Sequence, residues 1–182
     1  MYEIIKEKCL NSRETNPIKL VIMLMKNDGI PIHGPIHHIL DGAALLTAIH
    51  NVGVEFDLNN ALDELIERGT KMPGAACGKW GMCGSASSVG AALAILHGTG
   101  PLSNNEDYKN NLRLVSKALG KIAEIGGPRC CKRNAFLSIG TAVDFIDEKY
   151  GITLPKSKIK CEFSVENQQC IKGNCPFYNG GK

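Results

Sequence analysis

The sequence has few aromatic residues and no long apolar run. Aromatic residues make up 5% of the 182 residues, with a single tryptophan, so a core has to rest on Ala, Leu and Ile. The longest aliphatic run, Leu20 to Met25, is far shorter than the roughly 20 apolar residues that span a membrane. We therefore expect no transmembrane helix.

Three kinds of functional motif are also missing. The sequence has no Walker phosphate-binding loop, no glycine-rich dinucleotide turn after a strand and no Gly-x-Ser-x-Gly elbow. Its first ten residues lack the basic head, apolar middle and cleavage site of a signal peptide. A net charge of +3 is too small to indicate nucleic-acid binding. We expect a cytoplasmic protein that binds neither nucleic acid nor membrane.

What is present is the composition of a soluble globular domain. Hydrophobic residues make up 43% and charged residues 21% of the chain. No convincing alternating strand pattern occurs before residue 151, so the sequence predicts an all-α, compact bundle of about seven helices over residues 1–155. Residues 156–182 have little apolar content but three cysteines. We expect them to form an irregular, cysteine-rich metal-binding tail packed on the bundle.

Capping residues and apolar spacing mark individual helices. Asn16 before Pro17 predicts an N-cap and a first helical position, and Asp57 predicts a second cap. The helix after Asp57 has one apolar stripe, formed by Leu58, Ala61, Leu62, Leu65 and Ile66. The clearest amphipathic pattern comprises Tyr108, Leu112, Val115, Leu119 and Ile122. A further helix is expected between the Gly-Gly-Pro turn at 126–128 and Gly151.

A glycine-rich stretch from Pro73 to Leu96 organises the chain and contains Cys77 and Cys83. The small residues after Cys83 predict a tightly packed helix, whose first amides would face a ligand with partial positive charge. Such a position lowers the pKa of a thiol and suits a metal, a cluster or an attacking sulfur. The Cys-x5-Cys spacing is not that of zinc knuckles, whereas iron–sulfur clusters accept more varied spacings.

Two adjacent cysteines, Cys130 and Cys131, open another expected helix. One of them is expected to pack as a small buried hydrophobe, because adjacent cysteines seldom both ligate one zinc ion comfortably. The neighbouring basic residues are Arg129, Lys132 and Arg133, and Lys79 between the first two thiols. At a helix N-terminus they would lower thiol pKa values and bind an anion; the alternative is a solvated basic face.

The tail has the pattern Cys-x8-Cys-x4-Cys-Pro, formed by Cys161, Cys170 and Cys175. A proline after the last cysteine is familiar from cluster-binding sequences. Three thiolates leave a four-ligand site incomplete. The fourth ligand is open between a substrate, a histidine and the body cysteines Cys9, Cys130 and Cys131. A structural zinc ion with a borrowed ligand is the alternative to a cluster.

Histidines and buried acids could add to the site. His37 and His38 lie in the first turn of an expected helix, where they could ligate metal, donate protons or bind an anion. Neighbouring helix positions point to different sides, so at most one is expected to face the site. Asp41 and Asp144 interrupt apolar stretches and are either buried acids or surface residues. Ordinary polar or core roles are expected for His33, His50 and His97.

Four segments resemble an uncharacterised, cysteine-rich family of anaerobic archaea and bacteria. They are HGPIHHILDGAALLTA, GKWGMCGSASSVGAALAI, GGPRCCKRNAFLSI and the Cys-Pro tail. The resemblance covers about residues 18–178 of this chain. The family is a domain of unknown function that is sometimes beside or fused to S-adenosylmethionine-dependent methyltransferases. It implies an anaerobic setting and a methyltransferase partner on a separate chain, and it carries over no catalytic residues.

Three hypotheses follow from the residues. In the first, which we favour, the chain is an iron–sulfur protein of anaerobic redox or sulfur metabolism with a 4Fe-4S cluster in one central site. Its candidate ligands are Cys77, Cys83, Cys130, Cys131, Cys161, Cys170 and Cys175. A small anionic or sulfur-containing ligand would be bound by Lys79, Arg129 and Arg133.

The second hypothesis is a zinc-stapled binding module without a reaction, an accessory of a methyltransferase. The third is a metal-free thiol enzyme with Cys83 or Cys130 as nucleophile, and the further catalytic candidates are His37 and His38. A redox partner protein suits the first hypothesis, and a homodimer could bury the small-residue helices.

Overall fold

The computed structural model describes residues 1–180, which are all-helical as the sequence predicts. The helices of this range are α1 (Tyr2–Asn11), α2 (Pro17–Met25), α3 (His37–Asn51), α4 (Leu58–Lys71), α5 (Ala76–Lys79), α6 (Gly84–Leu96), α7 (Glu106–Ile125) and α8 (Cys131–Tyr150), with a short 3-10 helix η1 (Lys172–Asn174). The additional helix relative to the expected seven is α5, a single turn inside the glycine-rich stretch.

The predicted caps are confirmed. The Asn16 side chain accepts hydrogen bonds from the amides of Ile18 and Lys19, and Pro17 occupies the first helical position of α2. The Asp57 side chain accepts from the amide of Asn60 at the start of α4. Both caps can be predicted from the sequence because a cap depends on residues within one helical turn of it.

The centre of the fold is α3, which is buried along most of its length and packs most extensively against α6. Glycines permit this approach: a Cβ atom on Gly42 would come within 2.6 Å of the Ser88 carbonyl oxygen on α6. The Gly42 amide instead donates to the Ser88 hydroxyl at 2.9 Å. Gly90 similarly leaves room for Val115 of α7. The predicted tight packing of the small-residue helix is confirmed.

The apolar stripe predicted for α7 is only partly right. Leu112 is 58% exposed, whereas Leu114 and Ala118 are fully buried. Val115 and Ile122 are partly buried beside Ala118. The buried face is rotated because α7 packs against both α6 and α8, so its contact surface is wider than a single stripe.

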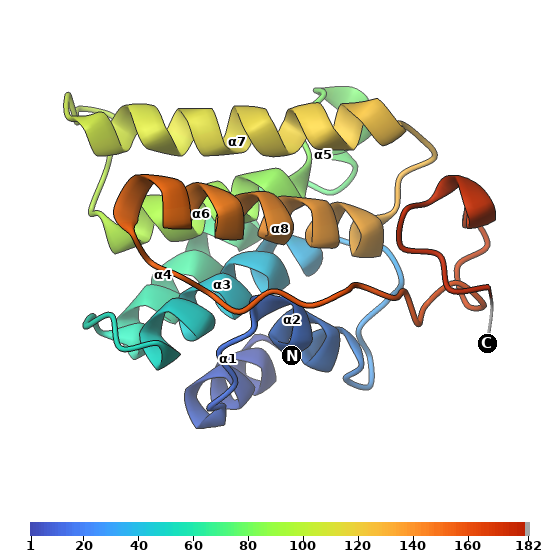
Figure 1. Cartoon of the computed structure of the whole chain (residues 1–182), viewed down its shortest axis with the longest axis horizontal. Coiled ribbons are helices and arrows are strands. Elements are labelled where there is room, and N and C mark those ends of the chain that lie inside the picture. Colours follow the sequence, from blue (N-terminus) through green and yellow to red (C-terminus); the bar gives the residue numbers. More distant parts are fainter. Residues whose placement is uncertain (181–182) are drawn as a thin grey trace.

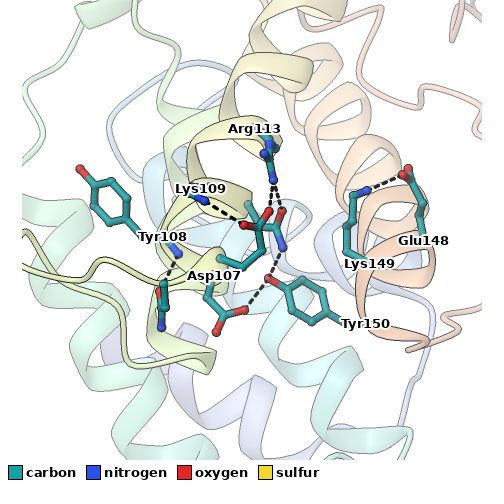
Figure 2. A network of polar contacts seen from close by, with 10 residues as sticks. Asp107, Tyr108, Lys109, Arg113, Glu148, Lys149 and Tyr150 are labelled. Atoms are coloured by element: carbon teal, nitrogen blue, oxygen red, sulfur yellow. Dashed lines mark hydrogen bonds and ion pairs between the residues drawn. The ribbon is translucent and has the colours of Figure 1, made fainter.

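A polar network fixes the start of α7 against the end of α8 (Figure 2). The Tyr150 hydroxyl donates to Asp107 at 3.0 Å and accepts from the Asn110 amide at 3.2 Å. Arg113 donates to the Asn110 side-chain oxygen at 3.0 Å and pairs with Glu106. This anchor lies at the opposite end of α8 from Cys130 and Cys131.

After α8 the chain is irregular and runs back along the bundle toward the end where α8 begins (Figure 1). Leu154 and Phe163 are buried in the main core, so this segment packs on the helices. An ion pair between Lys26 and Glu162 adds a contact with the end of α2. The last two residues of the predicted tail, 181–182, lie outside the described range.

Candidate metal centre and thiol cavity

The three tail cysteines and Cys130 line one narrow cavity of about 20 Å³. Cys130 is the N-cap of α8. Cys161 is held by its amide, which donates to the Phe177 carbonyl at 2.7 Å. Cys170 follows a turn in which its amide donates to the Asn167 carbonyl, and Cys175 directly follows η1. Of the body cysteines left open as the fourth member, Cys130 is the one in this cavity.

Nitrogen donors surround these sulfur atoms. The Arg133 amide and the Asn167 side chain each donate to Cys130 Sγ at 3.4 Å. The Lys172 amide donates to Cys170 Sγ at 3.4 Å. Hydrogen bonds of this kind favour the charged form of the acceptor, so they stabilise a thiolate over a thiol. They are also the kind of outer contact that orients metal ligands.

Two buried cationic side chains, Lys132 and Arg133, line the same cavity. Lys132 is 1% exposed, and its Nζ donates to the Pro31 carbonyl at 3.3 Å and lies 4.7 Å from the centre of the Phe163 ring. Arg133 is 3% exposed, and its Nη2 donates to the carbonyls of Gly126 and Pro128.

Neither cation takes part in an ion pair within the described residues. Burial lowers the pKa of Lys132 to about 8. Buried charge is costly unless opposite charge offsets it. Thiolates in the adjacent cavity would supply that charge.

No three His, Cys, Asp or Glu side chains between residues 1 and 180 come together as a group that could hold a metal ion. The four thiols surround a common cavity without forming such a group. All eight cysteines are free thiols.

The two cysteines of the glycine-rich stretch and Cys131 line a second cavity of about 260 Å³, here called the thiol cavity. Its thiols are Cys77, Cys83 and Cys131, and its other functional side chains are His37, His38, Ser85, Arg129 and Asn134. They come from the N-terminal parts of α3, α6 and α8, from α5 and from the turn before α8. The structure thus separates seven candidate cysteines into a set of four and a set of three.

The thiol cavity adjoins a groove of about 540 Å³ along α7. Four residues line both: Cys77, Cys83, Arg129 and Asn134. Cys83 is the N-cap of α6 and accepts a hydrogen bond from the Asn134 side-chain amide at 3.3 Å. Cys131 is the first residue of α8. A small molecule in the groove would therefore lie beside Cys77 and Cys83.

Both histidines of the first turn of α3 line the thiol cavity, whereas at most one was expected to. His37 is buried, its Nε2 donates to the Pro31 carbonyl at 3.1 Å, and burial lowers its pKa to about 3. The His38 ring occupies the space that a side chain at Gly84 would fill. Burial also lowers the pKa of His38. Both rings are therefore neutral.

The basic neighbours of the adjacent pair act to lower the thiol pKa values, as expected, but burial outweighs them. Burial raises the pKa of Cys130, and it raises the pKa of Cys131 to about 11. The opposing influence of Arg133 on Cys130 and of Arg129 on Cys131 is smaller. Desolvation of the charged form dominates because both sulfur atoms lie mainly inside the protein.

The remaining candidates occupy different environments. Arg129 is exposed and lines the thiol cavity, whereas Arg133 is buried and holds the preceding turn by its carbonyls. Lys79 is exposed at the end of α5. Asp41 is fully buried in α3, and neither of its oxygens has a hydrogen-bond partner of ordinary geometry in the described range, 1–180. Asp144 is exposed and pairs with Lys156.

Residues 5–178 match a family described as being of unknown function, DUF5714. The chain belongs to this family. No curated protein and no solved structure matches the sequence. The membership agrees with the resemblance to an uncharacterised family. In the described part of this DUF5714 chain, no helix is long and apolar enough to cross a membrane.

Two residues that connect the cavities were not predicted from the sequence. His33 Nε2 donates to Asn167 Oδ1 at 3.1 Å, and its Nδ1 accepts from the Cys131 amide at 3.4 Å. Asn167 in turn donates to Cys130 Sγ. His33 and Asn167 therefore connect the two cysteines of the pair through side chains 134 positions apart in the sequence. No local signal marks such a contact.

Proposed function

We propose that this DUF5714 protein is an iron–sulfur protein of anaerobic redox or sulfur metabolism, with a 4Fe-4S cluster bound by Cys130, Cys161, Cys170 and Cys175. The observation that carries the proposal is the cavity lined by these four thiols beside two buried cations. When bound, a cluster held by four thiolates would supply one-electron chemistry.

Charge supports a thiolate site of this kind. A cluster or a zinc ion with four cysteine thiolates keeps a net negative charge, and Lys132 and Arg133 would offset it from within the protein. The amide and side-chain donors to Cys130 and Cys170 favour the same thiolate form. The donor set therefore fits the group.

Two features favour a cluster over zinc. The tail spacing of eight and four residues is not the short spacer of zinc knuckles. Pro176 follows the last cysteine as in cluster-binding sequences.

Zinc is the second candidate, because a cavity of only about 20 Å³ needs less rearrangement for one ion than for a cluster. The protein would then be a binding or accessory module, and the zinc ion would hold the irregular tail on the helical bundle. A metal-free thiol enzyme is supported by the thiol cavity, but the raised pKa of Cys130 disfavours that residue as its nucleophile.

The proposal includes a reducing, anaerobic cellular environment and a protein partner. Eight free thiols suit the reducing cytoplasm, and an oxygen-sensitive cluster suits an anaerobic organism. A redox protein or a separate methyltransferase would be its partner, and a homodimer would cover exposed helix surface.

Substitution of cysteines tests the assignment of ligands. Cys161→Ser should lose most of the bound iron in protein purified without oxygen, whereas Cys9→Ser should retain it because Cys9 is buried in the core away from both cavities. Equal iron in both variants would contradict the proposed ligand set.

A further inference from the structure

The thiol cavity contains buried hydrogen-bond acceptors without partners. Asn134 is 5% exposed and His37 is 1% exposed. Among residues 1–180, Asn134 Oδ1 and His37 Nδ1 have no hydrogen-bond partner. The nitrogen atoms Asn134 Nδ2 and His37 Nε2 are both engaged. Because His37 Nε2 donates to a carbonyl, its Nδ1 carries the lone pair. Buried polar atoms are normally satisfied, so these two acceptors point to a ligand that brings donors.

Positive charge lies in the same cavity. Arg129 lines it and also borders the groove. The N-terminal ends of α6 and α8, which have 13 and 20 residues, are at its wall. The dipoles of both helices, the first amides of α6 and the guanidinium group favour an anionic group, such as a carboxylate.

The size and wall of the cavity limit the ligand further. A volume of about 260 Å³ is below the roughly 300–1,000 Å³ of sites for drug-sized ligands, so the ligand is a small metabolite. Three thiols form part of the wall, which makes it soft, polarisable and only weakly polar. A ligand with its own sulfur atom suits this wall better than one with a charged or strongly hydrated side chain.

We propose that the thiol cavity binds a free sulfur-containing amino acid of the size of cysteine. Its carboxylate would bind Arg129 and the first amides of α6. Its ammonium group would donate to Asn134 Oδ1 and His37 Nδ1, and its sulfur would contact the three cysteines. This deepens the proposed function by naming a ligand class for sulfur metabolism. Binding does not require the cluster.

Titration calorimetry without oxygen, on the full chain as purified, tests the ligand class. L-cysteine should bind most tightly. Three analogues, each lacking one feature, should bind about tenfold or more weakly: cysteamine without the carboxylate, 3-mercaptopropionate without the ammonium group, and L-serine without sulfur. Absence of L-cysteine binding at millimolar concentration, or equal binding of all four compounds, would overturn the inference.

A variant of an exposed residue locates the binding. Arg129→Ala should weaken binding of L-cysteine and 3-mercaptopropionate about tenfold and leave cysteamine unchanged. Arg13→Ala removes another exposed arginine, on the α1–α2 connection, and should change nothing. This pair also controls for any heat from iron chelation by thiols. Equal affinity for L-cysteine in the two variants would contradict the proposed orientation.

Metal analysis of the same samples separates the two proposals. Full iron content without L-cysteine binding would overturn the amino-acid site and leave the cluster in place. Specific L-cysteine binding by protein that contains no iron would support the amino-acid site and contradict the cluster.

Discussion

Cys130 and Cys131 are neighbours in the chain but line different cavities. Cys130 joins the three tail thiols, whereas Cys131 joins Cys77 and Cys83. The division arises because Cys130 is the extended N-cap of α8 and Cys131 is the first residue of its first turn. A metal centre at the first set would therefore lie one residue from the thiols of the second.

The buried cation next to Cys130 should have opposite effects on the metal-free and metal-bound protein. Lys132→Met removes a buried charge and keeps an unbranched side chain, so it should raise the melting temperature of metal-free protein. It should also speed the loss of metal to a chelator, because thiolates lose a compensating charge. Thermal scans and chelator kinetics measure the two effects.

The exposed Lys121 provides the control for that experiment. Lys121→Met should change neither quantity. A Lys132→Met protein that loses stability without metal and holds its metal as before would contradict the role assigned to this charge.

The buried carboxyl of α3 should make stability depend on pH. Burial raises the pKa of Asp41 to about 7 from the 3.8 of an accessible carboxyl, so the folded state holds this proton more tightly than the unfolded chain. The stabilising contribution is complete below about pH 4 and is lost as the pH rises to 7.

Asp41→Asn should therefore raise the melting temperature of metal-free protein at pH 8 and flatten its pH dependence. Asp144→Asn, at an exposed position of α8, should leave the pH profile as it is. If Asp41→Asn lowers the melting temperature at pH 8, the carboxylate has a compensating partner and the account of its burial is wrong.

Docking of the tail should depend on one aromatic side chain. Phe163 is buried in the main core and lies under Lys132 Nζ, so Phe163→Ala should lower the free energy of unfolding by about 3 kcal/mol. Val165→Ala, two residues away and 81% exposed, should be nearly neutral. Urea unfolding of both variants is the measurement, and equal midpoints would show that the tail is not docked by Phe163.

A single methyl group should disturb the thiol cavity. A Cβ atom at Gly84 would overlap the His38 ring, so Gly84→Ala should displace that ring and weaken ligand binding in the cavity. Gly120→Ala, on α7 where no atom lies near the added group, should be neutral or slightly stabilising. Unchanged binding and stability in Gly84→Ala would contradict the described packing.

Local features of the fold could be predicted from the sequence. The caps Asn16 and Asp57 depend on neighbouring residues, and the glycines and alanines after Cys83 allow only close helix packing. The buried face of α7 was less accessible to prediction, because two helices contact it and the exposure of Leu112 depends on where both lie.

The candidate site was predictable in its residue types and not in its grouping. Cysteine spacing predicted an incomplete four-ligand set in the tail, and Cys130 lines the same cavity as the three tail thiols. The choice between Cys130 and Cys131 depends on where the returning tail crosses the start of α8. The roles of His33 and Asn167 depend on the same long-range contact.

The most direct test of the proposed metal centre is the iron, acid-labile sulfide and zinc content of protein purified without oxygen, with a visible spectrum of the same sample. We predict iron with matching sulfide and the broad visible absorption of a thiolate-bound cluster. Zinc alone would contradict the cluster and make the four thiols a structural staple. A sample with neither iron nor zinc would contradict a metal centre altogether. The thiol cavity would then remain as the site of chemistry.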